Sequence, residues 1–123
     1  SLLFDHIDFS KEAFHQDHIF PKKLTTKSAL ESQGLDARTV DTIQELRDGL
    51  PNLQLLSGQA NYEKQSQMPL KWLNVHFSNT AKRNHFCSSN ELGNIPENIE
   101  EFPAWYEVRR QRLVDMLRTR LSI

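Results

Sequence analysis

The sequence predicts a small α+β domain in which two short strands and several helices share one core. Residues 15–20, closed by a proline, and the apolar run 53–56, closed by Ser-Gly, have the length and boundaries of strands. Residues 42–48 and 104–121 carry apolar side chains at helical intervals. With 123 residues, of which 37% are apolar and 25% charged, the chain has the size and composition of one globular domain.

Composition and charge limit the functional classes. A net charge of −1 gives no overall sign of nucleic-acid binding, although a local basic patch would be enough for it. Cys87 is the only cysteine, which excludes an intrachain disulfide and the zinc sites built from several cysteines. A reducing compartment fits this cysteine content, so we expect a cytoplasmic protein. No apolar run approaches the length of a membrane span.

The two strands are expected on either side of a longer connection. Residues 1–14 should be loop or extended chain that leads into the first strand at 15–20. Pro21 ends the pairing of that strand because it has no backbone N–H to donate. The second strand is expected at 53–56, before a turn formed by Ser57-Gly58.

Two helices are expected between these strands. The first is short, with Thr26 or Ser28 as its N-cap and Gly34 just after its end. The second should span residues 42–48 with Asp41 as its N-cap, because its apolar side chains form a stripe along one face.

The rest of the chain is expected to be mainly helical. One helix should cover about residues 59–64, and another should follow Pro69. The stretch 78–99 is rich in Asn and Ser and is expected to be irregular. A long final helix is expected over about residues 104–121, with Pro103 at its start.

Asp17 and His18 stand side by side in the first predicted strand. Hydrolysis of a phosphodiester needs a base that takes a proton from water, and positive charge that stabilises the phosphate and the leaving oxygen. Asp17 offers a carboxylate that can hold a divalent cation. His18 offers an imidazole, which suits the role of base because histidine is mostly neutral near pH 7.

Further polar residues fall at the second predicted strand and at the helix after it. Asn61 offers an amide oxygen as a second ligand, and a shell of one carboxylate and one amide selects magnesium or manganese over zinc. Lys64 follows three residues later on the same helix face, where it would meet the same phosphate. Asn52 precedes the second strand and would orient either His18 or the strand backbone by hydrogen bonding.

Three segments in this order resemble the motif of HNH (His-Me finger) nucleases: Asp17-His18-Ile19-Phe20-Pro21, then Asn52-Leu53-Gln54-Leu55-Leu56, then Asn61-Tyr62-Glu63-Lys64. The closest resemblance is to the C-terminal HNH domain of GmrSD-type modification-dependent restriction endonucleases and related phage-defence proteins. It implies a small ββα-metal core, in which a two-stranded hairpin packs on a helix with the ion between them. Additional helices, including the long C-terminal one, would surround that core.

The resemblance also implies roles for these residues. Asp17 and Asn61 would hold Mg²⁺ or Mn²⁺, and His18 would be the general base. Asn52 would be the central asparagine of the motif, and Lys64 would lie near the scissile phosphate. The single nuclease domain would span residues 1–123, with the motif core at about 14–73 and a helical extension at about 74–123.

The family context adds expectations about partners. The domain would cleave DNA as the effector of a bacterial restriction or anti-phage defence enzyme. An N-terminal recognition or NTPase domain would belong to the same protein, of which this chain would be a C-terminal piece in the bacterial cytoplasm. Cutting both strands with one site per chain would need two copies, so a homo-oligomer is a further expectation. Association with a membrane is not expected.

Two departures from the family pattern matter. Asn61 stands at a motif position where histidine is the usual residue, which implies weaker, oxygen-based metal binding. Residues 19–51 exceed a minimal hairpin connection, so an inserted helix is expected between the strands.

Several basic residues are candidates for contact with nucleic acid. Those that follow the first strand or lie on the final helix are Lys22, Lys23, Lys27, Arg109 and Arg112. The alternative for the arginines is a solvated helix face, where the helix dipole favours positive charge near the C-terminus. His15 lies two residues before Asp17 on the same strand face, where it would contact phosphate or pack on the strand surface. His76, His85 and Cys87 lack regular ligand spacing and are expected to be incidental.

Two other functions are consistent with the same residues. One is a nucleic-acid-binding or interaction module that keeps the fold without turning over a substrate. The other is a toxin nuclease of the same fold. Metal-dependent loss of substrate in a cleavage assay separates the binding module from either nuclease.

Overall fold

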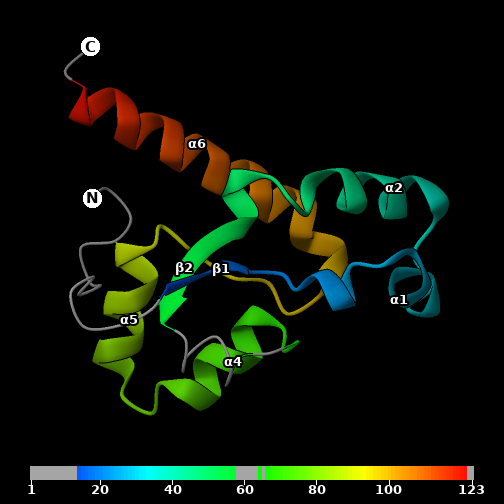
Figure 1. The fold of residues 1–123 in the computed structure, drawn as a ribbon, viewed down its shortest axis with the longest axis horizontal. Helices are drawn as coiled ribbons and strands as arrows, with labels where there is room; N and C mark the ends of the chain where they lie inside the picture. The colour runs from blue at the N-terminus through cyan, green and yellow to red at the C-terminus, as the bar shows by residue number, and fades with distance from the viewer. Residues whose placement is uncertain (1–13, 58–63, 65, 122–123) are drawn as a thin grey trace.

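The computed structural model describes residues 14–57, 64 and 66–121. The described elements, in chain order, are β1 (Phe14–His18), η1 (Lys22–Leu24), α1 (Lys27–Ser32), α2 (Ala37–Leu46), η2 (Leu50–Asn52), β2 (Leu53–Ser57), α4 (Pro69–His76), α5 (Thr80–Ser89), η3 (Ile99–Glu101) and α6 (Phe102–Arg120). Within these residues, helices accompany a two-stranded antiparallel sheet, which is the mixture of helix and strand expected of an α+β domain. Figure 1 shows α1 and α2 at one end of the molecule, and α5 with the C-terminal part of α6 at the other.

β1 and β2 form an antiparallel pair at the two positions where strands are expected. In the register of this pair, Asp17 lies opposite Gln54 and His18 lies opposite Leu53. β1 ends at His18, two residues before the expected end, because the next two backbone N–H groups find other partners. Ile19 N donates to the carbonyl oxygen of Asn52 at 2.7 Å, and Phe20 N donates to its Oδ1 at 2.8 Å.

Helix α1 has the caps that its sequence predicts. The Oγ1 of Thr26 accepts a hydrogen bond from Ala29 N at 3.1 Å, which makes Thr26 the N-cap. Gly34 follows the helix with a φ of 81°, in the left-handed region that glycine adopts without strain.

Helix α2 begins earlier than expected, and Asp41 is not its N-cap. Asp36 is the N-cap, since its Oδ1 accepts a hydrogen bond from Thr39 N at 2.7 Å. The earlier start brings Val40 into the helix, where it is buried together with Ile43. Asp41 lies within the helix on its exposed side.

The stretch 78–99 contains a helix, so the expectation that it is irregular is wrong for α5. Asn79 caps this helix by accepting a hydrogen bond from Lys82 N at 3.1 Å. Phe86 is buried and joins α5 to the core, while the polar residues of the helix lie mostly on exposed positions. Helix α4, in contrast, begins at Pro69 as expected.

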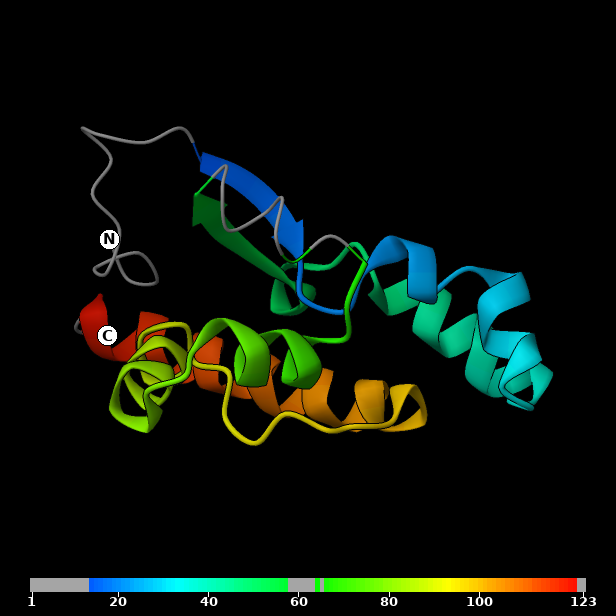
Figure 2. The same cartoon turned by 90° about the horizontal axis from the view of Figure 1, so that it is seen from below.

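Helix α6 confirms the long final helix, with Pro103 in its first turn. Figure 2 shows the hairpin as one layer over a second layer formed by α4, α5 and α6. None of the helices that the structure describes is long and apolar enough to cross a membrane. The helix expected at about 59–64, which would complete the ββα arrangement, lies outside the described residues except for Lys64.

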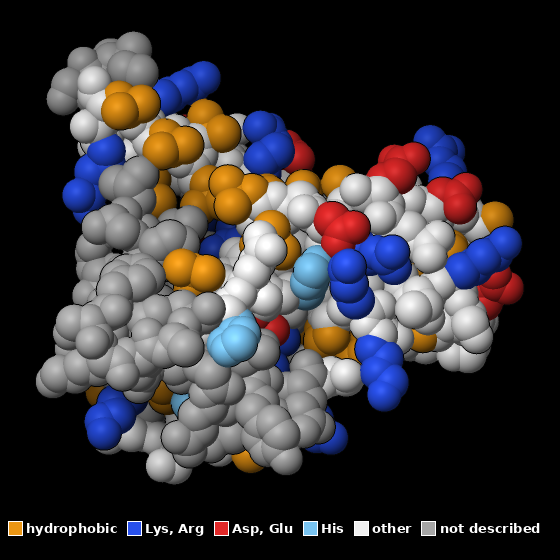
Figure 3. All heavy atoms as spheres, viewed as in Figure 1, with side chains coloured by type: hydrophobic (Ala, Val, Ile, Leu, Met, Phe, Trp, Pro, Cys, Tyr) orange, Lys and Arg blue, Asp and Glu red, His pale blue; other side chains and the backbone are white. Residues whose placement is uncertain are grey.

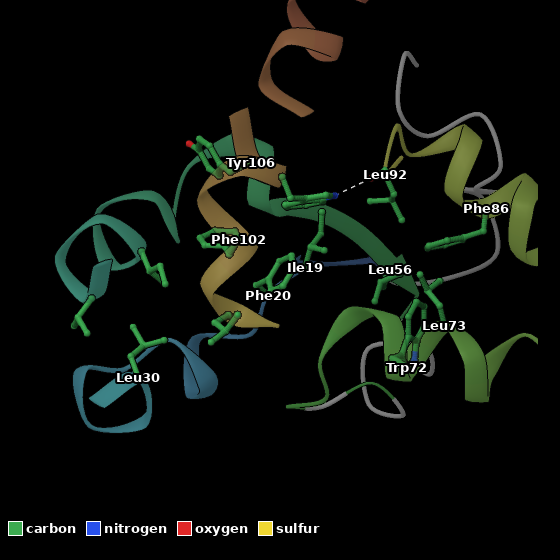
Figure 4. Packing of buried hydrophobic residues seen from close by; sticks show 14 residues of the cluster. Ile19, Phe20, Leu30, Leu56, Trp72, Leu73, Phe86, Leu92, Phe102 and Tyr106 are labelled. Atoms are coloured by element: carbon green, nitrogen blue, oxygen red, sulfur yellow. Dashed lines mark hydrogen bonds between the residues drawn. The ribbon is translucent and has the colours of Figure 1, made fainter. Parts of the chain in front are cut away.

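Packing in the hydrophobic core holds the residues that follow His18 in place. The ring of Phe20 lies 4.8 Å from that of Phe102 and 5.0 Å from that of Trp105, measured between centroids. Figure 4 shows Phe20 beside Phe102, and it shows Leu56 and Leu73 close together on the α4 side of the cluster. Because Phe20 is fully buried, the end of β1 is anchored two residues beyond His18.

Candidate functional site

Asp17 and His18 occupy the last two positions of β1, where alternation sends consecutive side chains to opposite faces. Asp17 is buried at 6% exposure, whereas the side chain of His18 is 22% exposed. Figure 3 shows histidine side chains in the middle of one face of the molecule, with basic and acidic side chains beside one of them. The strand therefore presents an imidazole and a buried carboxylate on consecutive residues.

Asp17 belongs to a buried polar cluster with Gln54 and Lys64. Gln54 Nε2 donates to Asp17 Oδ2 at 2.9 Å. Lys64 Nζ lies 3.1 Å from Asp17 Oδ2 and 3.4 Å from Oδ1, and it donates to the carbonyl oxygen of His18 at 2.9 Å. Burial lowers the pKa of the Lys64 ammonium, and the charge of Asp17 opposes this shift.

The sequence predicts a phosphate contact for Lys64, and this geometry does not provide one. Its side chain is 0% exposed, so the ammonium does not reach the surface on which DNA would lie. Its charge instead balances the carboxylate of Asp17, since a buried charge needs a partner of opposite sign. In the described arrangement Lys64 is therefore bound to the end of β1.

His18 is hydrogen-bonded to a carboxylate that the sequence pattern does not single out. Its Nε2 lies 2.8 Å from Asp48 Oδ1, just after the end of α2. This hydrogen bond is the main reason that the pKa of Asp48 lies below its usual value, and Lys22 and Arg47 add to the effect. A carboxylate in this place fixes the plane of the imidazole ring, as an orienting group does for a catalytic base.

Asn52 is fully buried and binds backbone rather than the imidazole. Its Oδ1 accepts from Phe20 N at 2.8 Å, and its Nδ2 donates to the carbonyl oxygens of Phe20 at 3.1 Å and Arg47 at 2.8 Å. The sequence leaves two roles for Asn52, to orient His18 or to orient the strand backbone. These contacts match the second role. Asn52 holds together the segments that carry His18 and Asp48.

Two predicted site residues remain, Asn61 and His15. Asn61, the second predicted ligand, lies outside the described residues. His15 lies opposite Leu56 in the sheet and is exposed, on the same face of β1 as Asp17. It is therefore open to a ligand on the surface, but its side chain does not share the enclosed surroundings of Asp17.

The candidates for nucleic-acid contact separate into exposed and buried residues. Lys22, Lys23 and Lys27 are exposed in or near η1, directly after the strand that carries His18. Arg112 is exposed on α6 and packs against Gly93. Arg109 is 1% exposed, so the prediction that it contacts DNA is wrong for this structure. Helix α6 docks on the body through this side, which the sequence pattern of the arginines does not reveal.

Asp17 is the one carboxylate of this cluster, and its oxygens are already bonded to the amide of Gln54 and the ammonium of Lys64, so a divalent cation would have to displace the ammonium to bind it. Asp17 offers carboxylate oxygen, and the buried Oε1 of Gln54 next to it has no hydrogen-bond partner among the described residues. Oxygen donors of this kind, completed by water, suit Mg²⁺ or Mn²⁺. Among the described residues there is no group of three or more His, Cys, Asp and Glu side chains that could hold a metal, so a histidine- or cysteine-rich zinc site is not found in this part of the chain.

The sequence pattern did not identify Gln54 and Asp48 as site residues. Gln54 interrupts the apolar run of β2 with a polar side chain, and that interruption is the signal that could have pointed to it. Asp48 gives no comparable signal, because it is one of many exposed acidic residues and its partner lies 30 residues away in sequence.

No protein-family model matches the sequence, and no curated protein matches it.

Proposed function

We propose that this domain is a metal-dependent DNA endonuclease of the HNH type that hydrolyses phosphodiester bonds with Mg²⁺ or Mn²⁺. The observation that carries the proposal is the placement of His18 and Asp17 at the end of β1. The first is a partly exposed imidazole and the second a buried carboxylate. Consecutive residues thus offer a base and a cation ligand, the two groups that hydrolysis of a phosphodiester requires.

His18 is the base in this proposal. A carboxylate can only accept a hydrogen bond, so the short contact with Asp48 makes Nε2 the donor and leaves Nδ1 as the acceptor. Nδ1 is then the nitrogen that takes a proton from the attacking water. Asp48 keeps the ring in one orientation and stabilises the imidazolium that forms.

Asp17 and Asn61 are the ligands in this proposal, by the family resemblance. When bound, the ion supplies positive charge to the phosphate and to the leaving oxygen. Asn52 keeps the end of β1 and the end of α2 at a fixed separation through its three backbone contacts. Lys22 and Lys23 offer exposed positive charge next to His18 for the phosphate backbone of DNA.

The resemblance to HNH nucleases also supports a cellular role for the domain. We propose that the domain acts as the effector of a bacterial restriction or anti-phage defence enzyme in the cytoplasm. A recognition or NTPase domain of the same protein would bring DNA to it.

Cleavage of supercoiled plasmid tests the proposal. The assay uses Mg²⁺, Mn²⁺ or EDTA and compares the parent with His18→Ala and His85→Ala. His85 is an exposed histidine on α5 and serves as the matched control. Nicking that needs the ion, is lost in His18→Ala and persists in His85→Ala supports the proposal. Ion-dependent nicking that persists in His18→Ala overturns the assignment of the base.

A binding assay separates the nuclease from a silent module. If the parent shifts a DNA duplex in a gel but does not cut it with either ion, the binding module becomes the better account. Loss of nicking in His18→Ala with unchanged DNA binding supports catalysis, because the base is not needed to hold DNA.

A further inference from the structure

A groove of about 290 Å³ lies beside the first half of α6, and the proposed nuclease site does not use it. One wall is a face of α6 that includes Glu101, Trp105, Val108 and Arg112, and the opposite wall includes Gly93 and Pro96. We call this feature the α6 groove. Figure 2 shows the segment between α5 and η3, which forms the opposite wall, along the side of α6 that faces away from the hairpin.

The residues that α6 contributes to the groove have the spacing of a helix that packs against another helix. From Glu101 through Trp105 and Val108 to Arg112 the intervals are four, three and four. Residues at these intervals share one face, and two helices with this pattern stay in contact along their length. Val108 is 54% exposed in the middle of this face. A single exposed valine is common on a protein surface, but this one stands beside a groove that an apolar side chain can fill.

The two ends of this face carry opposite charges. Glu101 and Arg112 are both exposed, and neither forms an ion pair with another of the residues that the structure describes. They are eleven residues apart, which is about 16 Å along the helix, so they do not pair with each other. A Cβ on Gly93 would meet Arg112 Nη1 at 2.8 Å, so the guanidinium lies directly against the backbone of the opposite wall.

A second copy of the same helix complements this face. The middle of the face falls between Trp105 and Val108, at equal distances in sequence from Glu101 and Arg112. A two-fold rotation about this middle sets two α6 helices antiparallel. It brings Glu101 of each copy to Arg112 of the other, and Val108 of each copy to Trp105 of the other. Each contact is then made twice, as in other two-fold interfaces between identical chains.

We propose that the α6 groove is the interface of a symmetric homodimer in which two α6 helices pack antiparallel. Val108 of each copy fills the groove of the other, and the charges at the two ends fix the direction and register of the helices. The interface contains no residue of the site around His18, so it stands or falls separately from the proposed function. It assigns a surface to the pairing that cutting both strands of DNA would need.

Light scattering on the full chain over a range of concentrations tests the dimer, which the parent should form as its concentration rises. Arg112→Glu and Glu101→Arg each place like charges at both ends of the interface. Either change should raise the dissociation constant of the dimer about tenfold or more. Arg118→Glu makes the same change of charge at an exposed arginine of α6 outside the groove, and it should dimerise like the parent.

Combining the two reversals tests whether these residues face each other. Glu101→Arg/Arg112→Glu in one chain restores opposite charges at both ends, so its dissociation constant should return close to that of the parent. An equimolar mixture of the two single variants should also pair, because one copy then carries glutamate and the other arginine at both positions. If neither the combined variant nor the mixture recovers dimerisation, the proposed interface is wrong.

Two results on the parent also overturn the inference. One is a parent that stays monomeric up to about 1 mM. The other is a parent dimer that neither single reversal weakens, which would place the contact on another surface. Ion-dependent nicking by a monomeric parent would leave the proposed function standing.

Nuclear magnetic resonance of the parent covers the case in which a variant does not fold. On dilution, the backbone amide signals of Glu101 and Val108 should move together as the dimer dissociates. The signal of Leu117, an exposed residue of α6 outside the groove, should stay in place. A dilution that moves Leu117 and leaves Val108 unchanged overturns the proposed interface.

Discussion

Arg109 and Pro51 lie 58 residues apart in sequence, yet an Nη1 of the guanidinium donates to the Pro51 carbonyl oxygen at 2.8 Å. The same guanidinium donates to the carbonyl oxygens of Leu50, Leu53 and Asn90. Burial lowers the pKa of Arg109 to about 10, so it keeps its charge near neutral pH. The final helix is thereby tied to the turn that leads into β2.

Replacing Arg109 with methionine should destabilise the domain strongly. Methionine fills similar space but leaves several buried carbonyl oxygens without a donor. We expect the free energy of unfolding to fall by about 3 kcal/mol or more, as measured by urea denaturation. Arg110→Met is the matched control, because Arg110 is exposed and forms an ion pair with Glu107 on the surface of the same helix. Equal losses in the two variants would show that the contacts of Arg109 add little.

The buried pair of Lys64 and Asp17 should behave as a unit. Lys64→Met or Asp17→Asn alone leaves a buried polar or charged group without its partner, and each should cost about 3–5 kcal/mol in EDTA. The double variant removes both charges, so its loss should be smaller than the sum of the single losses. Thermal or urea unfolding of the four proteins measures this coupling. Additive losses would mean that the two side chains do not interact in solution.

Local signals in the sequence were sufficient for much of the fold. Pro69 and Pro103 mark the beginnings of α4 and α6, and Thr26 caps α1 as expected. A proline or a capping hydroxyl acts within a few residues, so its effect can be read without knowing the tertiary structure. The same reasoning missed α5, because the cap residue Asn79 also has the character of a loop residue.

The environment of the site residues depended on tertiary packing and could not be read locally. Arg109, Arg110 and Arg112 look equivalent in sequence, and only the docking of α6 makes the first of them buried. Gln54 acquires its partner from the register of the hairpin. Asn61 lies outside the described residues, so its predicted role stays a prediction.

The carboxylate of Asp36 should make the stability of α2 depend on pH. The hydrogen bond from the backbone of Thr39 lowers the pKa of Asp36 below 3.8. A group with a lowered pKa in the folded state stabilises the protein above its unfolded pKa, and that contribution is lost as the pH falls through the folded value. Asp36→Asn keeps a capping oxygen but not the charge at the helix N-terminus.

The parent should therefore melt at a higher temperature than Asp36→Asn at neutral pH. The difference should shrink as the pH falls well below 3.8, where the cap becomes neutral in both proteins. Melting curves of both proteins between neutral and acidic pH measure it. A difference that stays constant over this range would contradict the role of the charge.

Asp48 should support catalysis by orienting His18. Asp48→Asn keeps the shape of the side chain but removes the charge that stabilises the imidazolium. On the proposed function, kcat should fall on the order of tenfold while KM stays near the parent value, because Asp48 would act on the base and not on DNA binding. Asp41→Asn changes an exposed aspartate on α2 in the same way and should leave both constants unchanged. Similar kinetics in the two variants would remove Asp48 from the mechanism.

Lys22 and Lys23 should contribute to DNA affinity through charge alone. They are exposed directly after Pro21, on the segment that follows His18. Affinity falls as salt rises, and each phosphate contact makes the plot of log affinity against log salt steeper by about 0.9. Lys22→Gln/Lys23→Gln removes two such contacts and should make this plot less steep by about 2. Fluorescence anisotropy with a labelled duplex measures this slope, in a His18→Ala background that prevents cleavage.

The matched control for this pair is Lys71→Gln/Lys82→Gln, which removes two exposed lysines from α4 and α5. Both double variants change the net charge of the domain by the same amount, so a nonspecific effect of charge would alter both slopes equally. A change confined to the Lys22 and Lys23 variant would mean that the DNA backbone runs past the end of β1. Equal changes would mean that DNA is attracted to the domain without lying across His18, and the proposed nuclease would then need another path for its substrate.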